Sequence, residues 1–141
     1  MNNYTDTTLL LYIYQNAKVG SSSLRNIIDK IKDKQLIKLL QLQINNYNKI
    51  IKSATFELSK IGQDEQDTIQ IPKITTYTGT KLDNLDNSTE VVSTLLTTTS
   101  LGNNDLEKVL DNSYSNKNVL NLGKKLQNCE SNFIYNLQNY T

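Results

Sequence analysis

Apolar residues recur in steps of three and four along most of the 141 residues, and this spacing is typical of amphipathic α-helices. The most regular run predicts a helix over residues 34–61. Its apolar face comprises Leu36, Leu40, Ile44, Tyr47, Ile51, Ala54, Leu58 and Ile61. Because only 5 Gly and 1 Pro interrupt the chain, a few long helices are favoured over a sandwich or barrel, which needs many turns.

The same spacing predicts three further helices, over residues 6–31, 73–111 and 116–139. The helix over 73–111 would be about 58 Å long, so it must bend, break or extend beyond its neighbours. Asp86 and Asn87 are the best place for a break, because an Asn followed three residues later by a Glu resembles a capping box. We therefore expect a shorter helix before this point and a longer helix after it.

Residues that begin and end helices lie at several of these boundaries. Asp33 precedes the helix over 34–61 as its expected N-cap, and Gly62 follows it as a left-handed stop. Ser115 is the expected N-cap of the last helix. The connections at Asp33 and at residues 111–114 are short, so each of them joins two helices into an antiparallel hairpin.

Two helical hairpins predict an all-α fold with a single domain, residues 1–141, built as an antiparallel four-helix bundle. The acidic residues 63–71 break the helical pattern, which indicates a crossover between the hairpins. One central crossover is typical of the ferritin-like topology, here with a long or broken third helix. An up-down-up-down bundle with a loose middle connection is the alternative.

The chain contains no histidine and one cysteine, Cys129. This excludes an imidazole general base, a histidine metal ligand, an internal disulfide and a cysteine metal cluster. We expect a protein that is not an enzyme and has no cofactor. Three carboxylates lie centrally enough to be weak metal-ligand candidates, Glu57, Glu90 and Glu130, but their spacing does not indicate a metal site. Glu57 is better explained as a flanking charge that pairs with Lys60.

Lys and Arg number 15 and Asp and Glu number 14, a balance that disfavours nucleic acid as a partner. The longest apolar run, residues 9–14, is too short to cross a membrane, and the first residues lack the charge of a signal peptide, so a cytoplasmic protein is expected. The charge is uneven, since residues 1–62 hold nine basic and four acidic residues and residues 63–112 hold three and nine. The first hairpin has an expected basic tip of Lys30, Lys32, Lys34 and Lys38.

Uneven charge and a long third region favour a structural or interaction protein that acts through self-association. The apolar stripe around Ile71, Ile74 and Leu82 would lack a partner within the bundle, and a second copy of the chain would cover it. We therefore expect a homo-oligomer, with neither nucleic acid nor membrane as a partner. The alternative is a degenerate metal-binding bundle that retains weak cation or small-ligand binding.

Gly20 falls near the apolar stripe of the first helix, where a residue without a side chain lets a neighbouring helix approach closely. Replacement by Leu is expected to cost about 1–3 kcal/mol through overpacking. Replacement by Ala is expected to be mild, or even stabilising, because Ala has the higher helix propensity.

Residues 14–20, Tyr-Gln-Asn-Ala-Lys-Val-Gly, resemble the opening of a group of small clostridial proteins of unknown function. The stretches from Pro72 through Asn121 and over residues 124–132 are similar to those proteins in their pattern of residues. The resemblance covers nearly the whole chain and implies a ferritin-like helical bundle, with no activity or ligand set to transfer. In a spore-forming host it also implies a coat or storage protein. Where those relatives tend to carry Glu after the Ala, this chain has Lys18.

Overall fold

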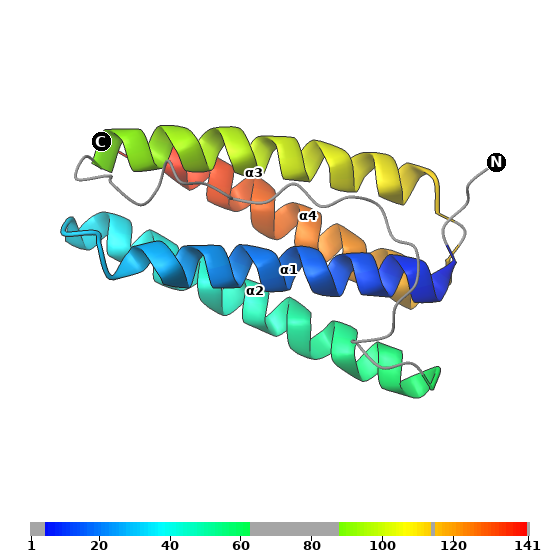
Figure 1. The fold of residues 1–141 in the computed structure, drawn as a ribbon. Coiled ribbons are helices and arrows are strands. Elements are labelled where there is room, and N and C mark those ends of the chain that lie inside the picture. The colour runs from blue at the N-terminus through cyan, green and yellow to red at the C-terminus, as the bar shows by residue number, and fades with distance from the viewer. Residues whose placement is uncertain (1–4, 63–87, 114, 141) are drawn as a thin grey trace.

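The computed structural model describes residues 5–62, 88–113 and 115–140 (Figure 1). Within these ranges every regular element of three or more residues is a helix, so the predicted all-helical class is confirmed. The four helices are α1 (Asp6–Ile28), α2 (Lys34–Lys60), α3 (Ser88–Asp111) and α4 (Lys117–Gln138). α1 packs along α2 and α3 along α4, and α4 also contacts α1 and α2, as in a helical bundle.

The third helical region begins at Ser88, one residue after the break that the sequence predicts at Asp86 and Asn87. The shorter helix expected before this break lies outside the described residues. So do the expected crossover at residues 63–71 and the apolar interface candidates Ile71, Ile74 and Leu82.

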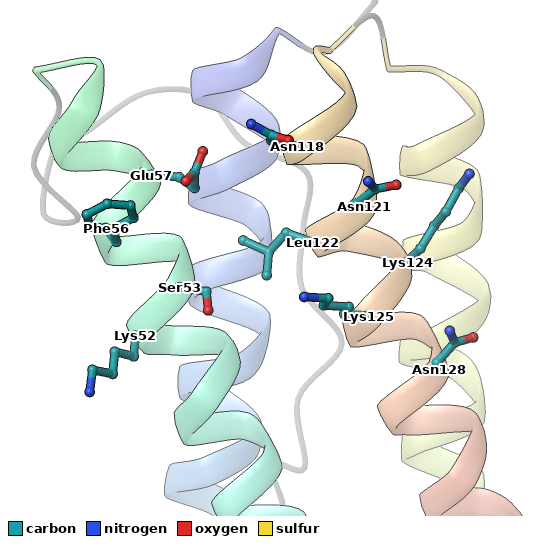
Figure 2. A pocket seen from close by; sticks show the side chains of 10 residues that line it. All are labelled: Lys52, Ser53, Phe56, Glu57, Asn118, Asn121, Leu122, Lys124, Lys125 and Asn128. Atoms are coloured by element: carbon teal, nitrogen blue, oxygen red, sulfur yellow. The ribbon is translucent and has the colours of Figure 1, made fainter.

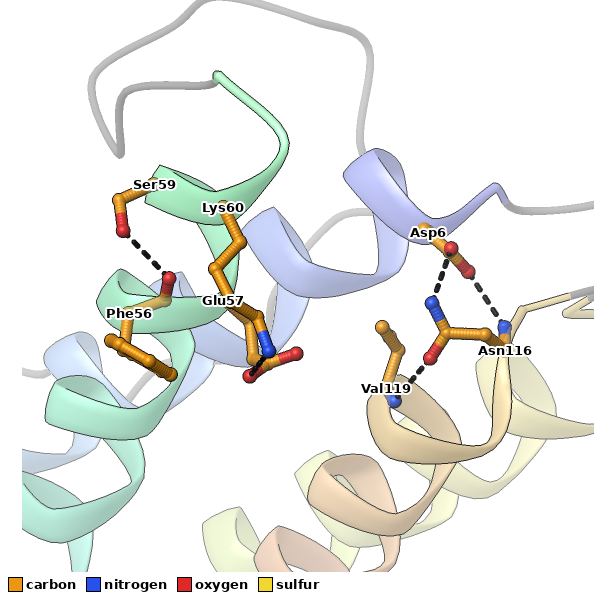
Figure 3. A network of polar contacts seen from close by, with 7 residues as sticks. All are labelled: Asp6, Phe56, Glu57, Ser59, Lys60, Asn116 and Val119. Atoms are coloured by element: carbon orange, nitrogen blue, oxygen red, sulfur yellow. Dashed lines mark hydrogen bonds and ion pairs between the residues drawn. The ribbon is translucent and has the colours of Figure 1, made fainter.

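Hydrogen bonds at the two ends of the bundle show how the helices run. Asp6, at the start of α1, accepts hydrogen bonds from the backbone N–H and the side-chain amide of Asn116, at the start of α4, at 2.8 and 2.7 Å (Figure 3). At the opposite end, Tyr140 follows α4 and hydrogen-bonds with Asp33, before α2, and with Ser88, the first residue of α3. α1 and α4 therefore run in one direction, and α2 and α3 run in the other (Figure 1).

The helices bury their apolar faces in one continuous core. α1 is buried on all sides over residues 9–14, six successive positions. The largest fully buried side chains are Tyr12, Tyr47, Leu9, Leu10, Leu11, Ile13, Leu24, Leu36, Leu40, Leu58, Leu95 and Leu106. The packing of these side chains, more than helix propensity, stabilises helices of this length in water.

The helices begin and end near the predicted capping residues, but the end of α1 and the N-cap of α4 differ from the prediction. Asp33 accepts hydrogen bonds from two N–H groups of the first turn of α2, and Gly62 has φ +73° after it, both as expected. α1 stops at Ile28 instead of residue 31, because the N–H groups of Lys30 and Ile31 bond to the carbonyls of Ile27 and Ile28, three residues back, in a turn that does not continue the α-helix. Asn116, and not Ser115, caps α4.

Replacing the Asn116 side chain tests this cap. Its Oδ1 accepts a hydrogen bond from the Val119 N–H at 3.1 Å, and its Nδ2 donates to Asp6 (Figure 3). Asn116→Ala loses both, so urea titration should show a stability lower by about 1 kcal/mol. Asn118→Ala, the same substitution at an exposed position two residues further on, is the control and should be close to neutral. Equal effects of the two substitutions would contradict the assignment of the cap.

Gly20 lies where α1 crosses α2, as expected. A Cβ atom built at Gly20 would lie 2.6 Å from both Cε2 and Cζ of Tyr47. The close neighbour is thus the ring of a large side chain on α2. This contact changes the expectation for Gly20→Ala, because there is no room even for one methyl group unless the ring moves.

Candidate functional site

A groove opens between α2 and α4, towards the end of α2 and the start of α4 (Figure 2). Its volume is about 730 Å³. Leu122 points into it from α4, and Lys125 extends from α4 towards α2, while Lys52 and Phe56 lie on its α2 rim (Figure 2). Among the described residues, its lining comprises Lys52, Ser53, Phe56, Glu57, Asn118, Asn121, Leu122, Lys124, Lys125 and Asn128.

The groove is basic. Glu57, the one carboxylate in the part of the lining that the structure describes, forms an ion pair with Lys60 at 2.9 Å, which confirms the pairing expected from their spacing (Figure 3). Lys52, Lys124 and Lys125 are exposed and form no ion pair with residues 5–62, 88–113 or 115–140. At neutral pH these ammonium groups make the groove and its two edges positive. Lys125 is directed across the groove, whereas Lys52 and Lys124 extend outward from the α2 and α4 edges (Figure 2).

An aromatic side chain lies beside these lysines. Phe56 is 61% exposed, although its neighbour Leu58 is fully buried. The Lys60 ammonium lies 5.1 Å from the centre of the Phe56 ring, a cation–π distance that orients the ring at the rim. The ring therefore adds an apolar surface to a rim that otherwise carries lysine side chains.

A second, smaller cavity of about 230 Å³ lies along the same two helices. Leu42 of α2 and Tyr135 of α4 both line it, and both are more than half exposed. Leu42 and Lys52 are ten residues apart, and so are Lys125 and Tyr135, which is about 15 Å along each helix. We call this surface, from Leu42 and Tyr135 to Lys52, Lys125 and Phe56, the α2/α4 face.

The outer side of α3 has the opposite charge. Its exposed residues include Glu90, Glu107 and Asp111, against one exposed lysine, Lys108. Leu101 lies among them and is 52% exposed. We call this surface the α3 face.

A polar cluster lies inside the bundle, beneath the α2/α4 face. Glu130 of α4 is 3% exposed, and its Oε2 accepts a hydrogen bond from the Tyr47 hydroxyl of α2 at 2.9 Å. Its other oxygen, Oε1, is buried without a hydrogen-bond partner in the described part of the chain. Next to it, Gln43 Nε2 lies 3.3 Å from Cys129 Sγ.

Burial dominates the acid–base properties of this cluster. It raises the pKa of Glu130 to about 7, although the hydrogen bond from Tyr47 acts in the opposite direction. Burial, assisted by the charge of Glu130, raises the pKa of the Cys129 thiol to about 12. Such a thiol is a poor nucleophile and metal ligand, since both functions need the thiolate.

The three carboxylates considered as metal ligands lie apart. Glu57 is paired near the end of α2, Glu90 is exposed in the first turn of α3, at the other end of the bundle, and Glu130 is in the core. In the residues that the structure describes, no three Asp, Glu or Cys side chains lie together as a metal site would require. Of these three candidates, only Glu130 lies in the core of the described bundle.

The basic tip surrounds the connection between α1 and α2, and all four of its lysines are exposed: Lys30, Lys32, Lys34 and Lys38. The groove residues Phe56, Lys124 and Lys125 were not among the sequence-based candidates. Helical spacing places them on outer faces, where lysine is common. The spacing within one helix carries no information about which two helices lie side by side.

Comparison with protein-family models, with curated proteins and with solved structures gave no significant match. Among the described helices, none combines the length and apolar character needed to cross a membrane.

Proposed function

We propose that this chain is a non-catalytic interaction protein that acts through self-association. The supporting observation is the division of charge between the α2/α4 face and the α3 face. Faces of opposite charge on one chain attract each other between copies and determine how the copies are oriented. Exposed apolar side chains on both faces, Phe56 and Leu101 among them, supply the area that such a contact buries.

We also propose a ferritin-like topology for the bundle. Each hairpin is antiparallel, and α2 ends at the end of the bundle opposite to that at which α3 begins. Bundles of the ferritin-like type have this arrangement of two hairpins. Their di-iron centres require Glu-x-x-His pairs, which a chain without histidine cannot provide, so an interaction function suits these residues better than iron chemistry.

Sedimentation velocity at micromolar concentration tests self-association. We expect an oligomer at low salt that dissociates in about 1 M salt, where exposed charges are screened within about 3 Å. A monomer under both conditions would contradict self-association. An oligomer that is indifferent to salt would retain self-association but contradict its electrostatic basis.

The groove also supports a second candidate function, the binding of a small ligand. Lys52, Lys124 and Lys125 favour an anion over the weakly held cation considered from the sequence, because ammonium groups repel cations. Asn118, Asn121 and Asn128 add amide donors and acceptors. A monomeric protein would make this candidate the stronger of the two.

A further inference from the structure

We infer that the partner of the α2/α4 face is the α3 face of a second copy, with Leu101 seated between Leu42 and Tyr135. This inference rests on the proposed self-association and specifies the contact. Two observations carry it, the positions of the exposed apolar residues and the register of the charges. Both observations are made on residues 5–62, 88–113 and 115–140.

The apolar match involves three side chains. Leu42 and Tyr135 line one small cavity from opposite helices, and both are more than half exposed. Leu101 is the large apolar side chain exposed on described α3. A single leucine inserted between two apolar side chains of facing helices is the packing by which a helix adds to a bundle.

The charges agree with the same register. Asp111 lies ten residues beyond Leu101, about 15 Å along α3. Lys52 and Lys125 lie the same distance beyond Leu42 and Tyr135 along the α2/α4 face. With Leu101 seated in the cavity and α3 parallel to α2, Asp111 comes level with the two lysines along the axis, and Glu107 comes about one turn before them. Both carboxylates project from the side of α3, about 80–120° around the helix from Leu101, whereas Lys108 lies nearly in line with Leu101. All five of these charged residues are exposed, and in this part of the α3 face the two carboxylates outnumber the one lysine.

The alternative of two α2/α4 faces meeting each other is unfavourable. It would place Lys52 and Lys125 of one copy against the lysines of the other, and like charges across an interface select against that pairing. A contact between two different faces is heterologous. In a pair joined in this way, one copy keeps a free α2/α4 face and the other copy keeps a free α3 face. Such contacts produce rings or open chains of copies instead of closed dimers.

Two charge-reversal variants test the contact by sedimentation velocity. K52E/K125E makes the α2/α4 face acidic, and E107K/D111K makes the α3 face basic. We expect each variant alone to sediment as a monomer at a concentration where the native protein is oligomeric. An equimolar mixture should associate again, because in the mixture each face meets the opposite charge on the other variant. Circular dichroism melts establish that both variants are folded.

K18E/K32E is the matched control for K52E/K125E, with the same change of net charge at exposed positions outside both faces. It should associate like the native protein. If the native protein is oligomeric and both face variants remain so, or if their mixture stays monomeric, this contact is wrong while self-association stands. A monomeric native protein contradicts both the contact and the proposed function.

Discussion

Between about pH 5 and about pH 8 the free energy of unfolding is expected to fall by about 2–3 kcal/mol. The cause is Glu130, whose pKa is about 7 in the folded protein against 4.5 for the ordinary side chain. The folded chain therefore holds this proton more tightly than the unfolded chain does. The stability from this proton is complete below pH 4.5 and is lost as the pH rises through about 7.

Few other groups obscure this effect. The chain has no histidine, and the pKa of Cys129 lies far above the window. Glu130→Gln is the matched variant, because its amide oxygen can still accept the hydrogen bond from Tyr47 but the side chain does not titrate. Urea unfolding across the window should show a slope for the native protein and almost none for the variant. Parallel slopes for the two proteins would show that Glu130 is not the group responsible.

Gly20→Ala is expected to destabilise the protein by up to about 2 kcal/mol, although Ala is the better helix former. The added methyl would lie 2.6 Å from the Tyr47 ring. The ring is fully buried and its hydroxyl is held by Glu130, so it cannot move aside without losing that hydrogen bond. Overpacking of about 1–3 kcal/mol then outweighs a gain of about 1 kcal/mol in helix propensity. Thermal unfolding measures the net change.

Gly123→Ala provides the comparison. There the added methyl would meet Cδ2 of Leu110 at 2.5 Å, but that atom is the end of a flexible, partly buried side chain that can rotate away. We expect this variant to be neutral or slightly stabilised. If Gly20→Ala is as stable as Gly123→Ala, the Tyr47 ring is free to move, and the bond to Glu130 does not hold it.

Local spacing predicted α2 closely, because capping signals at Asp33 and Gly62 coincide with a regular apolar face. α4 shows the limit of such spacing. From the sequence, the apolar residue expected on the stripe between Leu126 and Phe133 is Cys129, whereas the structure buries Glu130 and leaves Cys129 half-buried. Steps of three and four connect Leu126 to Phe133 through either residue equally well. Only the presence of the Tyr47 hydroxyl opposite Glu130 decides between them.

The groove was beyond sequence-based prediction for a related reason. Lys52 and Lys125 are 73 positions apart in the chain, and nothing in either helix indicates that the other lies beside it. Lateral neighbours follow from how the two hairpins pack, which depends on the shape of the whole core. The charge asymmetry along the chain was visible, but its arrangement as two faces was not.

The burial of Cys129 gives the molecule an internal chemical reporter. With a pKa of about 12, its sulfur carries almost no thiolate near neutral pH while α2 and α4 stay together. Once the helices separate, the thiol regains its ordinary acidity and reacts with an alkylating reagent. The rate of alkylation then measures how often this part of the bundle opens, and it does so in unlabelled, native protein.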